Sequence, residues 1–262
     1  MTYQPIVAGS GLVAWNFLQR TMDTQTQAFE ASPEISRDLD YFAENIGNVE
    51  TAEDLTSDRR LMTVVLGAYG LDDDINNTFF MNKILSEGSQ ADDALANRLA
   101  DKRYLKLAED FGFGDIGGPW HKVPGFVEDV QENFTTRQFE IAVGNQDDSL
   151  RLAMNAVREL EEIATSGSSD NAMWYTVMGS PPLRSVMETT FNLPSSFGTL
   201  DIDLQLETFR DRMDGITGDG EVSQFANEEV RDQIVQRYLL MSQISNTQTY
   251  SSNQIALTLL SY

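Results

Sequence analysis

The chain lacks cysteine altogether and has a single histidine, His121, among its 262 residues. Without cysteine it forms no disulfide, no thiolate zinc site and no cysteine nucleophile. One histidine excludes a site that needs two, and no nucleophile elbow accompanies it for a serine–histidine–aspartate site. His121 stands in a glycine- and proline-rich stretch beside Trp120, so we expect it to be structural and partly exposed. We predict a non-enzymatic protein with no cofactor and no metal.

Basic residues are also scarce, with 18 lysines and arginines against 41 acids and a net charge of -23. Such an acidic surface repels nucleic acid and anionic membranes and favours a basic partner. No segment approaches the roughly 18 apolar residues of a membrane span, and the first ten residues lack the features of a secretory signal. We predict protein partners, no nucleic acid and no membrane insertion. The expected location is the cytoplasm, or outside it after export by a route that needs no cleaved signal; the oligomeric state stays open.

Proline is confined to positions that suit helix edges or loops, and no long alternating run predicts a strand. Ser32-Pro33 is typical of a helix start, and Thr51–Asp54 resembles a capping box. Apolar residues recur at spacings of three and four, which predicts an all-α multi-helix bundle. The expected helices cover residues 12–29, 33–46, 58–69, 75–87, 94–111, 126–142, 149–164, 172–178, 183–191, 200–213 and 227–244.

We expect two helical halves, residues 1–114 and 125–262, joined by a Gly/Pro-rich linker at 115–124. The N-terminal Thr2–Ser10 is polar and expected to be loose, and a flexible tail is expected from about residue 245. The halves show a faint internal repeat at an offset of 122 residues, which either duplication or chance explains. The matching residues are Leu61, Val64, Tyr69 and Leu71 in the first half, and Leu183, Val186, Phe191 and Leu193 in the second.

Two glycine-rich stretches resemble ligand-binding motifs only superficially. Gly112-x-Gly114-x-x-Gly117 spells a dinucleotide fingerprint, but it follows an expected helix rather than a strand. The stretch Asp214–Glu221 suggests a calcium loop, but an EF-hand register places Gly215 first and Ala226 twelfth, where acids are required. We therefore expect neither a nucleotide nor a calcium site.

The most distinctive stretch, residues 94–114, reads as one amphipathic helix that ends at glycine. Its apolar residues fall on one face, and Arg98, Lys102 and Lys106 line up at i, i+4 and i+8 on the other, with Arg103 beside them. Two interpretations stay open. The basic residues form an ordinary solvated face that pairs with nearby acids, or they form a contact with a partner or between the halves.

Several segments together resemble an alphaproteobacterial family of unknown function whose members are often encoded among flagellar genes. Its most specific part is Asn97–Asp101. The resemblance implies a helical protein tied to flagellar assembly or structure, and it assigns no catalytic residue. The similar segments are Asp38–Ile46, Thr56–Asp74, Leu95–Phe113, Arg137–Leu152, Trp174–Phe191 and Leu200–Gln205.

The expected function is therefore that of a non-enzymatic, flagellum-associated structural or accessory protein acting through helix–helix contacts. A cytoplasmic chaperone-like or regulatory protein for a flagellar component is the alternative, and a small-molecule enzyme is a third hypothesis. The polar N-terminus is compatible with an unfolded export signal. Ile255, Leu259 and Leu260 predict either an assembly helix on a partner or a last helix folded back on the core.

Overall fold

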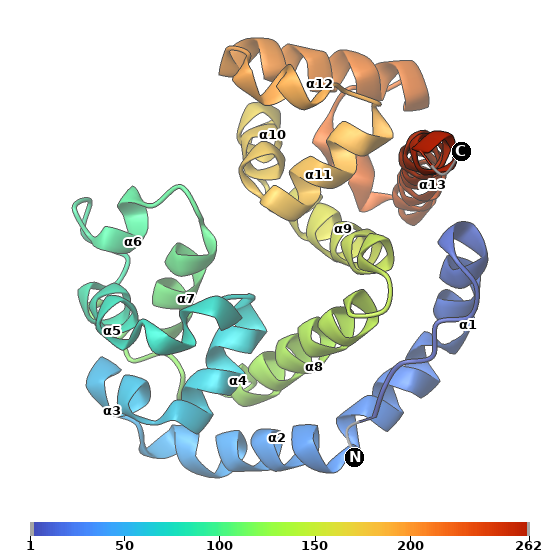
Figure 1. The fold of residues 1–262 in the computed structure, drawn as a ribbon. Helices are drawn as coiled ribbons and strands as arrows, with labels where there is room; N and C mark the ends of the chain where they lie inside the picture. The colour runs from blue at the N-terminus through green and yellow to red at the C-terminus, as the bar shows by residue number, and fades with distance from the viewer. Residues whose placement is uncertain (1–2, 261–262) are drawn as a thin grey trace. The chain divides into compact units, whose positions relative to one another are not determined.

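The computed structural model describes residues 3–260 of the chain, and their side chains as far as residue 245. Over this part of the chain it has thirteen α-helices and four short 3₁₀ helices, with no strand (Figure 1). The prediction of an all-α multi-helix protein is confirmed. Within the described residues, none of the helices combines the length and the apolar composition of a membrane span.

The described chain divides into two compact units, and neither is continuous in sequence. Unit 1 holds the residues up to Ile6 and Thr21–Ala142, whereas unit 2 holds Val7–Arg20 and the residues from Val143 onward. The division passes through two helices, α1 (Gly11–Glu30) and α8 (Phe126–Gly144). The Gly/Pro-rich residues 115–124, expected to separate two halves, lie inside unit 1 because their aromatic side chains pack there.

Unit 1 follows the helix signals of its sequence closely. The second helix starts at Pro33 as expected, although the Ser32 side chain makes no capping bond. The capping box is present, since the Thr51 hydroxyl accepts the Asp54 N–H and the Asp54 carboxylate accepts the Thr51 N–H at 2.9 Å. Besides parts of α1 and α8, the unit contains α2 (Pro33–Asn45), η1 (Ile46–Asn48), α3 (Ala52–Ser57), α4 (Arg59–Tyr69), η2 (Asp72–Asn76), α5 (Thr78–Glu87), α6 (Leu95–Arg98) and α7 (Arg103–Phe111).

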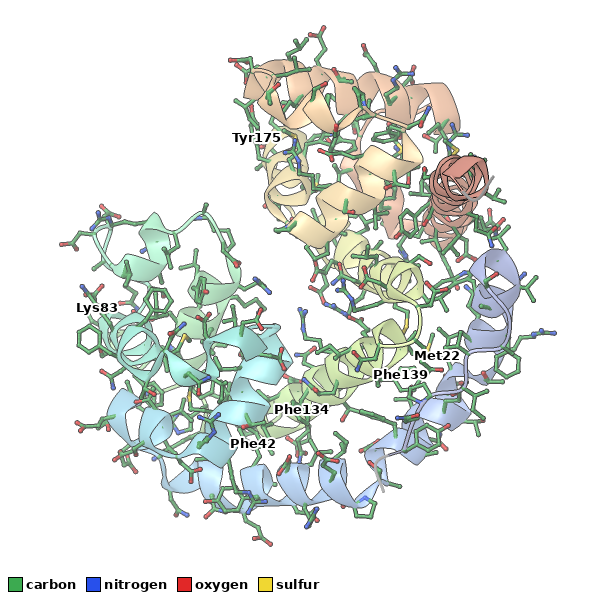
Figure 2. The ribbon with its side chains drawn as sticks, viewed as in Figure 1. Met22, Phe42, Lys83, Phe134, Phe139 and Tyr175 are labelled. Carbon is green, nitrogen blue, oxygen red and sulfur yellow. The ribbon has the colours of Figure 1, made fainter. Side chains whose placement is uncertain are left out.

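Aromatic side chains fill the core of unit 1. Phe42, Phe134 and Phe139 are buried there (Figure 2), and Phe139 meets Phe29 edge to face at 5.7 Å between ring centroids. Helix α4 approaches α8 closely at Gly67, where a Cβ atom would lie 2.7 Å from the Phe134 ring. Glycine at this position therefore allows the two helices to pack.

Residues 3–6 are held against α1, so the expectation that the N-terminal stretch is loose is wrong for these residues. The buried amide of Gln25 accepts the Ile6 N–H at 2.6 Å and donates to the Ile6 carbonyl at 3.1 Å. It also donates to the Thr21 hydroxyl at 2.8 Å. One side chain thus satisfies both main-chain groups of a residue 19 positions away.

In unit 2, the first helix of the chain contacts the last one. Helix α13 (Glu228–Leu260) packs against the first half of α1, where a Cβ on Gly11 would overlap the Gln243 side chain and Gln19 donates to Asp232 at 3.4 Å. Side chains are described only as far as residue 245, so those of Ile255, Leu259 and Leu260 lie outside the described part. Their contact, on a partner or on the core, stays a prediction. The remaining elements are α9 (Asp148–Ala164), α10 (Asp170–Gly179), α11 (Pro181–Thr190), η3 (Ser195–Thr199), α12 (Ile202–Thr217) and η4 (Val222–Ala226).

Helices α4 and α11 agree in more than hydrophobic spacing. They begin 122 residues apart, at Arg59 and Pro181, and each ends in a left-handed residue at the same offset, Gly70 (φ 68°) and Asn192 (φ 52°). The same capping bond follows both helices. The Leu71 N–H donates to the Leu66 carbonyl at 2.8 Å, and the Leu193 N–H donates to the Glu188 carbonyl at 2.9 Å. The agreement at the helix end extends the internal repeat by one feature, but this cap is common among helices, so duplication and chance both stay open.

Candidate functional site

The stretch predicted as one helix over 94–111 is broken. Helix α6 ends at Arg98, Leu99 is extended, and α7 begins only at Arg103. Asp101 stabilises the break, since it accepts the Arg103 N–H at 3.0 Å at the start of α7. Glu87 accepts the Leu95 N–H at 2.7 Å and so caps the start of α6. The apolar residues still pack together, with Leu99, Tyr104 and Leu105 against a buried cluster on α5 to α7. The pattern thus predicted burial correctly for most of these residues, although Ala100 is exposed, and it predicted continuity wrongly.

The expected line of basic residues does not form, because its members lie on two helices and the turn between them. Arg98 is exposed at the end of α6, and Lys102 donates to the Asn97 carbonyl at 3.4 Å. Arg103 pairs with Asp101 at 2.7 Å and also donates to the Gly70 carbonyl. Lys106 pairs with Asp110 one turn along α7 at 3.0 Å. Their contact with a partner or between the halves stays a prediction.

Two tyrosine–aspartate bonds join α7 to its neighbours in unit 1. The Tyr104 hydroxyl donates to Asp74 at 2.6 Å, and the Tyr69 hydroxyl donates to Asp110 at 2.8 Å. Burial, followed by the bond to Asp74, raises the pKa of Tyr104 to about 12. Burial and Asp110 also raise the pKa of Tyr69. Both phenols therefore stay protonated as donors near neutral pH.

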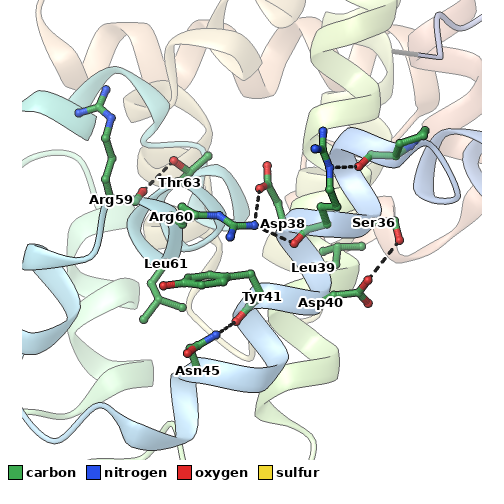
Figure 3. A network of polar contacts seen from close by, with 12 residues as sticks. Ser36, Asp38, Leu39, Asp40, Tyr41, Asn45, Arg59, Arg60, Leu61 and Thr63 are labelled. Atoms are coloured by element: carbon green, nitrogen blue, oxygen red, sulfur yellow. Dashed lines mark hydrogen bonds and ion pairs between the residues drawn. The ribbon is translucent and has the colours of Figure 1, made fainter. Parts of the chain in front are cut away.

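A polar network joins α2 to α4 on the surface of unit 1 (Figure 3). The Arg60 guanidinium lies over the Tyr41 ring, 3.8 Å from its centroid, and contacts Asp38 at 3.5 Å. The Tyr41 hydroxyl donates to Asp58, the N-terminal cap of α4, at 2.7 Å. This hydrogen bond raises the pKa of Tyr41. Sequence reasoning missed the network because its residues come from two helices, and no local motif marks it.

A shallow cleft of about 420 Å³ adjoins the corner between α1 and α2. Carboxylates, amides and a hydroxyl dominate its wall, so it suits water or a cation better than an apolar ligand. It is lined by Gln27, Glu30, Ala31, Ser36, Leu39, Asp40 and Gln131. No group of three or more acidic or histidine side chains in the described residues is arranged to hold a metal ion.

The histidine is buried, at 2% exposure, so the expectation of partial exposure is wrong. His121 packs among the rings of Phe111, Phe113 and Phe126, with centroids 5.2 to 6.2 Å away. Its Nε2 lies 3.0 Å from the Val49 carbonyl, whereas Nδ1 has no partner among the described residues. Burial lowers its pKa. The histidine therefore anchors the 112–125 loop, which is a structural role.

Unit 2 exposes apolar side chains on its terminal helices. Val13 on α1 and Leu240 and Ile244 on α13 are 47% to 69% exposed, although neighbouring residues of both helices are buried. Leu240 and Ile244 are four residues apart and share one side of the helix. We call these three residues the terminal apolar positions.

A second group of exposed apolar side chains surrounds the start of α12. Leu200, Ile202, Leu204 and Tyr175 are 39% to 48% exposed. Tyr175, on α10 (Figure 2), donates to Asp203 at 2.9 Å and so lies beside the first turn of α12. Residues 200–205 belong to one of the segments that carry the family resemblance, but no local pattern in the sequence predicts that their apolar side chains are exposed.

Comparison with known proteins gives a family and a fold. Residues 68–230, more than half of the chain, match a family model described as a protein of unknown function (DUF1217). A crystal structure of an Agrobacterium tumefaciens protein is similar, with a TM-score of 0.75 and 24% identity, over 93% of this chain and 98% of that one. At this identity the likeness shows the fold alone. Among curated proteins, no relative matches the chain.

Proposed function

Because the chain belongs to the DUF1217 family of unknown function, we propose from its exposed surfaces that it is a non-enzymatic structural or accessory protein of the flagellum. It acts through helix–helix contacts. The flagellar setting of this proposal rests on the sequence resemblance, which runs through both units. The family itself, expected from that resemblance, is confirmed.

The terminal apolar positions carry the proposal. Exposing Leu240 and Ile244 to water costs about 25 cal/mol for each Å² of apolar surface, and a partner helix that covered them would recover that energy. Helix α13 is long, at 33 residues, so it offers room for such a helix beside its buried face. Val13 adds an apolar side chain on the helix that packs against α13.

Location tests the flagellar part of the proposal. The tagged protein is followed in cytoplasm, medium and sheared flagella, with and without a working flagellar export ATPase. We expect it in flagella or medium only when export works. Strict retention in the cytoplasm would contradict a structural role and favour the chaperone-like alternative.

Substitution of the terminal apolar positions tests the contact. The variant Leu240→Ser with Ile244→Ser is expected to reduce incorporation into flagella without unfolding the protein, because both side chains are exposed. Phe79→Ser with Val123→Ser changes two exposed apolar residues of unit 1 and serves as the control. Equal incorporation of the two variants would show that the contact lies elsewhere.

A further inference from the structure

Apolar side chains at the start of α12 are exposed to solvent. Leu200, Ile202 and Leu204 alternate with Asp201 and Asp203, and all five are exposed. The buried side of the helix is formed instead by Gln205, Leu206, Phe209 and Met213. Leu200, Ile202 and Leu204 therefore lie at the edge of this core, with 42% to 48% of each residue exposed.

An acidic ridge continues from this apolar group along α12. Leu204, Glu207, Asp211 and Asp214 follow at i, i+3, i+7 and i+10 and are all exposed, so they lie on one side of the helix. Residues 201–214 hold five acids against two arginines. One of these, Arg210, is already paired with Asp170 across to α10, with its Nε 3.0 Å from the carboxylate.

The position of these acids within α12 is unfavourable for the isolated protein. The helix ends at Thr217 with no basic residue in its last turn, where Asp214 stands instead. The helix macrodipole favours a cation at that end and disfavours an anion. Neighbouring acids at i+3 and i+4 spacings also repel one another. A positive charge from outside the chain would relieve both effects.

We propose that this face of α12 docks an amphipathic basic helix from a protein partner. Apolar side chains at one end of the partner helix cover Leu200, Leu204 and the Tyr175 ring, whereas Ile202, two residues before Leu204, lies on another side of the helix. Lysines or arginines spaced three and four residues apart then pair with Glu207, Asp211 and Asp214. The surface is separate from the terminal apolar positions, and the proposal holds whether the protein is exported or retained.

The test measures fluorescence anisotropy of labelled peptides mixed with the full chain. The probe is a helical peptide of about 18 residues, or five turns, with leucines at one end and lysines along one side. A second peptide has the same composition in scrambled order. We expect the ordered peptide to bind more tightly, because only its helix presents both groups to one face.

Matched variants locate the binding. Glu207→Gln with Asp211→Asn removes two charges from the ridge, and Leu200→Ser with Leu204→Ser removes two apolar side chains. Each is expected to weaken binding about tenfold. The controls change exposed residues elsewhere: Glu44→Gln with Asp73→Asn, and Phe79→Ser with Val123→Ser. They are expected to leave the affinity within about twofold.

Three outcomes would overturn the proposal. Equal binding of the ordered and scrambled peptides would show that composition alone matters. Equal weakening by the Glu44 and Asp73 control would show attraction to the overall negative charge. Full affinity after loss of the leucines would show that the apolar group takes no part.

Discussion

The imidazole of His121 has one nitrogen bonded and the other without a partner. With Nε2 beside the Val49 carbonyl, Nε2 must donate and the neutral ring carries its proton there. A second proton on Nδ1 would create a buried donor without an acceptor among the described residues. The nearby charged groups are Lys122, which lowers the pKa, and Glu50, which raises it, and burial dominates both.

We therefore expect the free energy of unfolding to fall as the pH is lowered below about 6.5, the ordinary histidine pKa. In this range the unfolded chain binds the proton that the folded chain refuses, so acid favours unfolding. Urea denaturation at about pH 7.5 and pH 5.5 measures the change. No other histidine titrates between these two pH values, because the chain has only one.

His121→Gln provides the control for that experiment. A glutamine amide is able to donate to the Val49 carbonyl but does not titrate. Its stability is expected to vary less between the two pH values than that of the natural protein. The same change in both proteins would assign the pH dependence to other groups.

Asn192 supports a second prediction at the level of the residue. Its left-handed conformation ends α11, and asparagine and glycine tolerate this conformation better than other residues. Asn192→Ala is expected to lower the free energy of unfolding by about 1 kcal/mol. Asn192→Gly is the matched control and is expected to cost less, as measured by urea denaturation. Equal loss from both would mean that the asparagine side chain, and not the backbone, matters.

At the scale of the element, Asp101 holds the break between α6 and α7. Burial raises its pKa and the Arg103 contacts lower it, with a net shift downward. Asp101→Ala removes the acceptor of the Arg103 N–H, and we expect a loss of about 1 kcal/mol in the free energy of unfolding. Chemical denaturation checks the value. Asp93→Ala, in the exposed turn before α6, is the control, and an equal loss there would contradict the assignment.

Elements defined by adjacent residues were predictable, and elements defined by distant contacts were not. Pro33 marks the start of α2 correctly, since its signal lies within one turn. The Thr51–Asp54 box is also formed, but α3, the short helix that it begins, was not among the expected helices. The start of α6 is capped by Glu87, eight residues before the Leu95 N–H that it accepts, and no local motif marks this bond. The position of the N-terminal stretch likewise depends on Gln25, which binds Ile6 only when the stretch lies beside α1.

The candidate site was predicted even less well than the fold. The basic residues were chosen because one continuous helix would align them, so the broken helix removes that alignment. The burial of His121 depends on Val49, 72 residues away, which no local pattern indicates. The exposed residues of α12 were visible in the sequence, but their exposure follows from what the core leaves uncovered.

At the scale of the whole molecule, the excess of acids predicts a response to salt. With 41 acids and 18 bases, the folded chain repels itself, and salt screens this repulsion. We expect the melting temperature to rise between about 20 and 300 mM sodium chloride, as followed by circular dichroism. A fall would show that surface ion pairs, such as Lys122 with Glu50 at 2.5 Å, outweigh the repulsion.

The discontinuous units have a consequence for the order of synthesis. Residues 7–20 belong to unit 2 and leave the ribosome long before the α13 residues that they contact, Asp232 and Gln243. Residues 21–142, which belong to unit 1, emerge between them. Unit 2 therefore completes its folding only after α13 has been translated, whereas these residues of unit 1 are available earlier.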